Sequence, residues 1–269
     1  MAKFLTLNTH SWLGEDPKWA LETLGKQILK ADYDVIALQE INQRIDSAKV
    51  LNTPYTLKNQ HQLHEDNYAL KLVEYLKEHG LTYHFTWAYS HIGYDKYHEG
   101  VALLSKQPFS SEKSVLTSAV DDEYNYHTRR ALIAKTTVAG RELCVVSGHF
   151  SWWKSDFKSE WQRLEQALAD EQAPLVIMGD FNNPENTPGH ELVLASPLGL
   201  KDSHLAAKKV TGGPTILQDI DGWENNDKAL RIDFIFVSQQ LEVKESHVLF
   251  DGKKSPLISD HFGVECVIE

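Results

Sequence analysis

Carboxylate, amide and imidazole side chains stand where the apolar runs of this sequence end or begin. These residues are Asn8, Glu40, His149, Asp180, Asn182, Asp233, Asp260 and His261. Strand ends are places where a rigid scaffold can hold a reactive side chain in a cleft. Oxygen ligands without a thiolate suit a hard cation such as Mg²⁺ or Mn²⁺ beside a phosphate, and imidazoles and amides can orient water or donate to phosphoryl oxygens. Together these groups predict metal-assisted hydrolysis of a phosphoester.

Each of these residues also has an ordinary structural interpretation. Asp180 lies in Gly-Asp-Phe-Asn-Asn-Pro, whose residue types favour turns. His149 fits a hydrogen-bonded core histidine, and Asp233 fits an ion pair with the nearby Arg231. Glu40 alone is typical of a solvated acid at a strand end. Since all the positions carry only Asp, Asn, Glu or His, coincidence explains the whole set poorly, and we interpret it as one reaction centre.

Short apolar runs rich in β-branched residues recur along the chain and predict the strands that would position this centre. They lie at residues 4–7, 35–38, 101–104, 131–135, 143–147, 175–178, 232–237 and 263–268. Several are apolar at nearly every position, which is typical of strands covered on both faces. Helices are predicted from Asp16-Pro17 to about Lys30, from near Asp66 to before Gly80, and from near Ser155 to before Pro174. Since no linker divides the chain, we expect residues 1–269 to form a single domain.

The composition excludes several classes of protein. The 27 basic and 38 acidic residues give a formal net charge of −11, so no diffuse basic field is present to attract nucleic acid or a lipid surface. The two cysteines, Cys144 and Cys266, cannot build a disulfide framework. No run approaches the roughly 18 apolar residues that span a bilayer, and the first residues lack the pattern of a secretory signal. We expect a cytoplasmic protein without a membrane or an obligate protein partner.

Seven short motifs, in order along nearly the whole chain, resemble those of the endonuclease/exonuclease/phosphatase superfamily, the fold of deoxyribonuclease I. They are Leu-Thr-Leu-Asn ending at Asn8, Ile-Ala-Leu-Gln-Glu ending at Glu40, Glu99–Lys106, Ser-Gly-His-Phe around His149, Met-Gly-Asp-Phe-Asn ending at Asn182, Arg231–Phe236 and Ser259–Gly263. The resemblance implies an α/β (α+β) fold, a four-layer sandwich of two mixed β-sheets packed face to face and flanked by helices. A weak repeat, Leu5–Trp12 and Val146–Trp153, would suit the pseudo-symmetric halves of that fold.

The same resemblance implies roles for the metal and the attacking water. Glu40 would bind Mg²⁺, with Mn²⁺ as the alternative ion, and Asn8 and Asp260 would contribute to the metal site. Asp180 and Asn182 would position and activate the water that attacks phosphorus. Attack would be in line, with no covalent enzyme intermediate.

Two histidines are implied to stabilise charge on the phosphate. Asp233 would orient His261, which would contact the scissile phosphate. His149 and His261, together with the metal, would stabilise the charge added at phosphorus. Glu99 falls where members of the family pair a carboxylate with the histidine at the position of His149. A hydrogen bond between Glu99 and His149 is therefore predicted.

Basic and aromatic residues near these motifs indicate the kind of substrate. Arg129 and Arg130 form the only adjacent arginine pair, which is too little for a long nucleic-acid backbone but suits one dianionic phosphate. Trp12, Trp152 and Trp153 offer flat faces that stack on a sugar, a base or a lipid headgroup. Further aromatic rings precede Glu99, namely those of Tyr89, His91, Tyr94, Tyr97 and His98.

The pairing of Asn-Thr-His-Ser-Trp near the start with His-Phe-Ser-Trp-Trp in the middle resembles the bacterial branch that includes maltose 6′-phosphate phosphatases. This implies a Mg²⁺-dependent phosphomonoesterase that acts on a phosphorylated sugar. A nuclease or other phosphodiesterase, acting on nucleic acid or a lipid headgroup, is the main alternative. A non-catalytic binding module is the third hypothesis, and it is disfavoured because no essential acid or histidine is missing from the motifs.

Overall fold

The computed structural model describes residues 1–51 and 61–269 and contains two mixed β-sheets. The seven-stranded sheet has the order β10 (Lys209–Thr211), β12 (Val243–Leu249), β13 (Gly263–Ile268), β1 (Ala2–Asn8), β2 (Val35–Arg44), β4 (Tyr97–Ser105) and β3 (His84–Gly93). The six-stranded sheet has the order β5 (Phe109–Leu116), β6 (Arg130–Val138), β7 (Arg141–His149), β8 (Leu175–Asp180), β11 (Asp233–Ser238) and β9 (Leu200–Asp202). The helices are η1 (Ser11–Leu13), α1 (Pro17–Ala31), α2 (Tyr68–Glu78), α3 (Phe157–Leu168), α4 (Pro188–Leu194) and α5 (Ser203–Ala206). None of the helices in the described ranges is long and apolar enough to cross a membrane.

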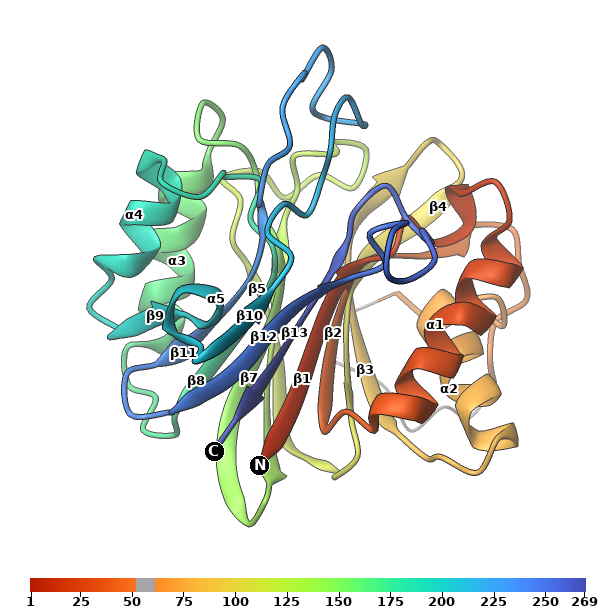
Figure 1. Cartoon of the computed structure of the whole chain (residues 1–269). Helices are drawn as coiled ribbons and strands as arrows, with labels where there is room; N and C mark the ends of the chain where they lie inside the picture. The colour runs from red at the N-terminus through yellow and green to blue at the C-terminus, as the bar shows by residue number, and fades with distance from the viewer. Residues whose placement is uncertain (52–60) are drawn as a thin grey trace.

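Three apolar layers hold the sheets and helices together. Phe4 of β1 and Val176 of β8 belong to the layer between the two sheets. The next residues, Leu5 and Ile177, point to the opposite faces, where they join the layers under α1 and α2 and under α3. These strands are apolar at consecutive positions because both of their faces are covered. Figure 1 shows α1 and α2 on one side of the paired sheets and α3 and α4 on the other, which confirms the four-layer sandwich.

The predicted elements are all present, and others were missed. Asp16 caps α1, where its Oδ1 accepts a hydrogen bond from the backbone N–H of Trp19 at 3.0 Å. Asn67 caps α2 in the same way, one residue after the predicted start. Each of the eight predicted runs lies in a strand or overlaps one. The sequence patterns did not predict β3, β5, β9, β10 and β12 or the helices α4 and α5.

Two parallel β-α-β units form the centre of the molecule. β1 pairs in parallel with β2 across α1, and β7 pairs in parallel with β8 across α3. The weak sequence repeat falls at the same place in each unit, at the end of the first strand. The chain termini lie together at one end of the sandwich in Figure 1, so β1 and β7 carry their last residues, Asn8 and His149, to the other end.

Gly179 lets β8 pass close to β7 just before Asp180. Its φ is +150°, and a Cβ there would lie 1.9 Å from the carbonyl oxygen of Gly148. We expect Gly179→Ala to lower the free energy of unfolding by about 2 to 3 kcal/mol, measured by urea denaturation, because the backbone contact cannot relax.

Gly140→Ala is the matched control for this substitution. Gly140 also has a positive φ, +80°, but a Cβ there would meet no atom within 4 Å. Gly140→Ala should lower the free energy of unfolding by about 1 kcal/mol, which is the cost of a positive φ for alanine. Equal costs at the two positions would show that the β7 to β8 contact is not the reason for Gly179.

Candidate functional site

The topology brings the predicted site residues to one end of the sandwich. Asn8, His149 and Asp180 are the last residues of β1, β7 and β8. β11 is antiparallel to β8 and β13 is antiparallel to β1, so Asp233 at the start of β11 and His261 just before β13 lie at the same end. In register, Asp180 is opposite His149 on one side and Asp233 on the other. The sheet geometry therefore assembles the group from segments far apart in sequence.

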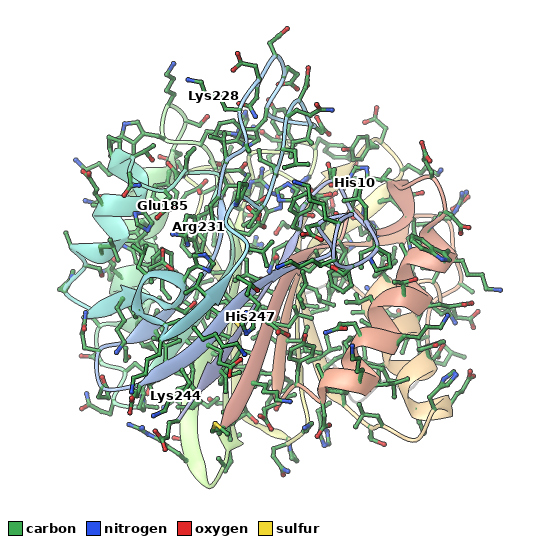
Figure 2. All side chains as sticks on the ribbon, viewed as in Figure 1. His10, Glu185, Lys228, Arg231, Lys244 and His247 are labelled. Carbon is green, nitrogen blue, oxygen red and sulfur yellow. The ribbon has the colours of Figure 1, made fainter. Side chains whose placement is uncertain are left out.

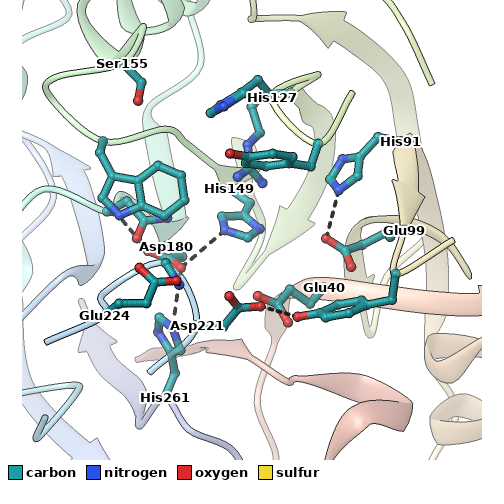
Figure 3. Close-up of a pocket in the computed structure, with 17 residues that line it drawn as sticks. Glu40, His91, Glu99, His127, His149, Ser155, Asp180, Asp221, Glu224 and His261 are labelled. Atoms are coloured by element: carbon teal, nitrogen blue, oxygen red, sulfur yellow. Dashed lines mark hydrogen bonds and ion pairs between the residues drawn. The ribbon is translucent and has the colours of Figure 1, made fainter. Parts of the chain in front are cut away.

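Asp180 lies at the centre of this group and is buried. Its Oδ1 accepts a hydrogen bond from the backbone N–H of Asn182 at 2.9 Å, and its Oδ2 accepts one from Nδ2 of Asn8 at 3.2 Å. The same Oδ2 lies 3.5 Å from Nε2 of His149 and 3.7 Å from Nε2 of His261 (Figure 3). Burial raises the pKa of Asp180, and this outweighs the lowering by the His261 charge. A carboxyl group with a raised pKa suits proton transfer from water.

His261 and His149 are driven to opposite charge states. Nδ1 of His261 donates to Oδ2 of Asp233 at 2.9 Å, so the orientation predicted for this pair is present. Burial lowers the pKa of His261, but the charges of Asp233 and Asp180 outweigh it and raise that pKa well above its usual value. Burial and the charge of Arg129 hold the pKa of His149 well below its usual value. The site therefore combines a cationic and a neutral imidazole.

Glu40 reaches the site through an irregularity in β2. The pairing of β2 with β4 shifts between Leu38 and Ile41, and Glu40 has a φ of +53°, which is rare for a residue with a side chain. Its Oε1 accepts a hydrogen bond from Nδ2 of Asn8 at 2.9 Å, whereas its buried Oε2 has no hydrogen-bond partner. Burial raises the pKa of Glu40, but the interactions with His10 and the hydrogen bond from Asn8 outweigh it and lower that pKa below its usual value, so the carboxylate stays ionised.

The surroundings of Glu40 favour a positive charge. Nδ1 of His10 lies 3.4 Å from Oε2 of Glu40 and 3.6 Å from Oδ1 of Asp260. Burial lowers the pKa of His10, but Glu40 and Asp260 outweigh it and raise that pKa to about 9. A buried, ionised carboxylate oxygen without a hydrogen bond fits a divalent cation. Asn8 turns its amide nitrogen, not its oxygen, toward the carboxylates, so its predicted place in the metal site would be that of a hydrogen-bond donor.

A second group could also hold a metal ion. Suitable atoms of Asp180, Asp233 and His261 all lie within 4.8 Å of one another. However, Oδ2 of Asp233 and Nδ1 of His261 are already joined by a hydrogen bond. Oδ1 of Asp233, like Oε2 of Glu40, is buried without a hydrogen-bond partner among the described residues. Both sides of the site thus offer a free carboxylate oxygen, and on the Asp233 side the second oxygen is occupied by His261.

The predicted hydrogen bond between Glu99 and His149 is absent from the described part of the chain. Oε1 of Glu99 instead lies 3.4 Å from Nε2 of His91 (Figure 3). The strand register explains this, because Glu99 in β4 stands opposite His91 in β3 and opposite Asn42 in β2. Burial and the charge of Glu40 raise the pKa of Glu99. Glu99 still belongs to the site, but with a different histidine.

The side-chain amide of Asn182 is held at both ends. Its Nδ2 donates to the backbone carbonyl of Phe150 at 3.0 Å, and its Oδ1 accepts a hydrogen bond from Nε1 of Trp223 at 2.8 Å. Asn182 itself has a φ of +49°, a conformation that asparagine tolerates better than most residues. Two loops therefore fix the amide beside Asp180.

A cavity of about 610 Å³ opens onto these residues. This volume lies within the range of pockets that bind small molecules. The reactive side chains described above line part of it, and the rest of the lining is aromatic, acidic and basic. The principal residues of the lining are Glu40, His91, Tyr94, Glu99, Tyr126, Arg129, His149, Trp152, Asp180, Asn182, Asp221, Glu224 and His261.

Arg129 is the unusual member of this lining. It is only 5% exposed, and within the described residues its guanidinium group makes no hydrogen bond or ion pair. Its backbone is fixed, since its N–H donates to Oγ of Ser118 at 2.8 Å and its carbonyl accepts a hydrogen bond from the N–H of Thr117 at 2.9 Å. Burying a charge without a partner is costly, so its presence in a cavity is typical of a site for an anion.

Three predicted substrate contacts lie outside this cavity. Arg130 forms an ion pair with Asp121. Nε1 of Trp12 donates to the backbone carbonyl of Asp66 at 2.8 Å, which holds the indole in the packing under α1 and α2. Trp153 is exposed and does not line the cavity. Arg129 and Trp152 do line it, so of the five predicted substrate contacts these two lie in the cavity.

Several site residues escaped the sequence analysis. His10 stands two positions after Asn8, within the motif Asn-Thr-His-Ser-Trp. Its place in that motif could have identified it as a site residue. Asp221, Trp223 and Glu224 come from a loop without periodicity or motif, and no sequence signal pointed to them.

Comparisons with known proteins agree with this architecture. A sequence profile of the Endonuclease/Exonuclease/phosphatase family matches residues 11–261. An endonuclease/exonuclease/phosphatase family protein from Leptotrichia buccalis C-1013-b is 31% identical, with a TM-score of 0.88 and full coverage of both chains. A mannosyl-6-phosphatase from Bacteroides thetaiotaomicron VPI-5482 is 17% identical, with a TM-score of 0.70 and 100% coverage of both chains.

Another structure of the same fold is that of D. rerio TDP2 complexed with a single-strand DNA product. It is 16% identical, with a TM-score of 0.68, and the match covers 100% of this chain and 98% of that chain. No curated protein sequence matches this chain significantly. Relatives of this fold thus include both a sugar phosphatase and a protein solved with DNA. The profile match and the 31% identical relative show that the chain belongs to the endonuclease/exonuclease/phosphatase family of hydrolases.

Proposed function

We propose that this protein is a divalent-metal-dependent phosphomonoesterase that removes phosphate from a phosphorylated sugar. The observation that carries the proposal is the buried, unpartnered guanidinium of Arg129, which shares one cavity with Glu40, Asp180 and His261. An arginine fork matches the oxygens of a terminal phosphate and holds it beside the reacting groups.

The lining of the cavity favours a small substrate over a nucleic acid. Arg129 is its one arginine among the described residues, and no lysine lines it. A protein that binds a nucleic-acid backbone meets several phosphates with several cations. Trp152, Tyr94 and Tyr126 offer aromatic faces, and Asp221 and Glu224 offer acceptors for hydroxyl groups. This combination suits a sugar with one phosphate.

The reaction follows from the positions of the chain's own groups. Asp180 is placed to take a proton from the water that attacks phosphorus, while Asn8 and the backbone of Asn182 fix its carboxylate. The bond between phosphorus and the sugar oxygen breaks, and that oxygen takes a proton from the solvent as the sugar leaves. The His261 imidazolium, oriented by Asp233, donates to a phosphoryl oxygen and stabilises the charge that develops there. Arg129 anchors the phosphate on another side. A Mg²⁺ or Mn²⁺ ion held by Glu40, with Asp260 beside it, would supply further charge neutralisation at phosphorus.

Metal removal tests the part of the proposal that concerns Glu40. We expect EDTA to abolish turnover and added Mg²⁺ or Mn²⁺ to restore it. Glu40→Gln should weaken Mg²⁺ binding by at least about 100-fold, measured by calorimetry, because it removes the ionised ligand. Glu112→Gln, on the exposed β5, is the control and should bind the ion like the wild type. Activity that survives exhaustive chelation would contradict a metal-dependent reaction.

A phosphate-release screen tests the substrate class. The purified protein with Mg²⁺ is incubated with hexose 6-phosphates, a disaccharide phosphate, nucleotides and plasmid DNA. We expect phosphate release from the sugar monoesters and intact plasmid. Cleavage of DNA without release from any small monoester would overturn the proposal in favour of a nuclease.

A further inference from the structure

Residues 217–229 form a compact loop, here named the strap, that rises beyond the end of the sheets (Figure 1). Its base is closed by hydrogen bonds between Ile216 and Leu230, at 3.0 Å in both directions. Within it, the N–H of Trp223 donates to the carbonyl of Ile220 at 2.9 Å, and the N–H of Asn225 donates to Oδ2 of Asp219 at 3.1 Å. Figure 2 labels Lys228, which belongs to this loop, at the top of the view. The strap is therefore an ordered part of the fold.

Three contacts seat the strap over the cavity. Asp221 accepts a hydrogen bond from the hydroxyl of Tyr94 (Figure 3). Gly222 packs against Trp152 so closely that a Cβ would lie 2.3 Å from the indole ring. Nε1 of Trp223 donates to Oδ1 of Asn182 at 2.8 Å. The strap thus touches both the aromatic part of the lining and the amide beside Asp180.

The strap also gives the cavity an uneven distribution of charge. Asp221 and Glu224 line it, and neither carboxylate forms an ion pair within the described ranges. Arg129 lines the same cavity and is the one arginine among its described lining residues, which include no lysine. A substrate with one phosphate can bind with its phosphate next to Arg129 and with its opposite end next to the strap. A second anionic group would meet carboxylates without compensation.

We propose that the strap determines substrate specificity because it contacts the end of the substrate that carries no phosphate. Asp221 and Glu224 accept hydrogen bonds from hydroxyl or ammonium groups and repel a second anion. This inference rests on the proposed function, since it assumes a phosphorylated sugar. The substrate class it names is a neutral or amino sugar with a single phosphate, as opposed to a sugar bisphosphate or a phosphorylated sugar acid.

The double variant Asp221→Asn plus Glu224→Gln tests this assignment. It removes both charges while it keeps the shape of the strap and an acceptor for Tyr94. The measured quantity is the ratio of kcat/KM for 6-phosphogluconate to kcat/KM for glucose 6-phosphate, with glucosamine 6-phosphate as the cationic comparison. In the wild type we expect the acid to be disfavoured by at least about 10-fold. The double variant should lose most of this discrimination, and Glu224→Lys should reverse its direction.

Asp227→Asn is the matched control, because Asp227 belongs to the strap but does not line the cavity. Its ratio should equal that of the wild type. An unchanged ratio in both the double variant and Glu224→Lys would overturn the role of the strap while sugar phosphates remain substrates. Failure of the wild type to hydrolyse any of the three sugar phosphates would overturn the proposed function and this inference together.

Discussion

Asp180→Asn is expected to lower kcat for phosphate release by about 10³-fold. Four groups converge on this carboxylate, from Asn8, Asn182, His149 and His261. An amide has nearly the same shape, so the packing around it survives. The amide in this variant cannot take a proton from water. Where its NH₂ group replaces Oδ2, it faces the NH₂ group of Asn8, which is also a donor. The measurement is kcat with saturating Mg²⁺ and sugar phosphate, alongside circular dichroism to show an intact fold.

Asp202→Asn separates this effect from the general cost of removing a buried charge. Asp202 is also buried, and its Oδ2 lies 2.7 Å from Arg231 and 3.1 Å from Nε2 of His190, away from the cavity lining. We expect this control to lower the melting temperature and to leave kcat of the folded protein near the wild-type value. Near-normal turnover in folded Asp180→Asn would remove Asp180 from the reaction.

The strands that sequence patterns predict are those whose two faces are both covered. Val35 and Ile36 in β2 enter different apolar layers, so the run is apolar throughout and stands out. β5 has the sequence FSSEKSVL and is largely exposed at a sheet edge, so hydrophobicity does not mark it. β9 and β10 have three residues each, too few for a periodic signal. Exposure and length thus explain these three missed strands. β3 is long and buried but was also missed, because Thr, Ser and His residues interrupt the apolar pattern of its sequence HFTWAYSHIG.

The site shows the same division between strand ends and loops. Asp180, Asp233 and His261 were recognisable because they interrupt apolar runs, and the structure brings them into contact. The partner of Glu99 depended on the register between β3 and β4, which a motif does not specify. The strap residue Trp223 contacts Asn182 across 41 positions of sequence, and no local pattern predicts such a contact.

Arg129→Met is expected to weaken substrate binding and, at the same time, to make the folded protein more stable. The side chain of methionine fills a similar space, but the phosphate loses its charged partner. We expect KM for a sugar phosphate to rise by about 100-fold, since a hydrogen bond to a charged group contributes about 1.5 to 3 kcal/mol. Because the guanidinium is buried without a partner, its removal should raise the free energy of unfolding by about 1 kcal/mol or more. Steady-state kinetics and urea denaturation measure the two effects.

Arg130→Met is the natural comparison, because the neighbouring arginine is paired with Asp121 outside the cavity. It should leave KM near the wild-type value and give no gain in stability. Inorganic phosphate provides a second measurement, since a ligand that binds only the folded state raises the melting temperature. Phosphate should raise the melting temperature of the wild type and of Arg130→Met, but not that of Arg129→Met. An Arg129→Met protein with unchanged KM and an unchanged response to phosphate would place the phosphate site elsewhere in the cavity.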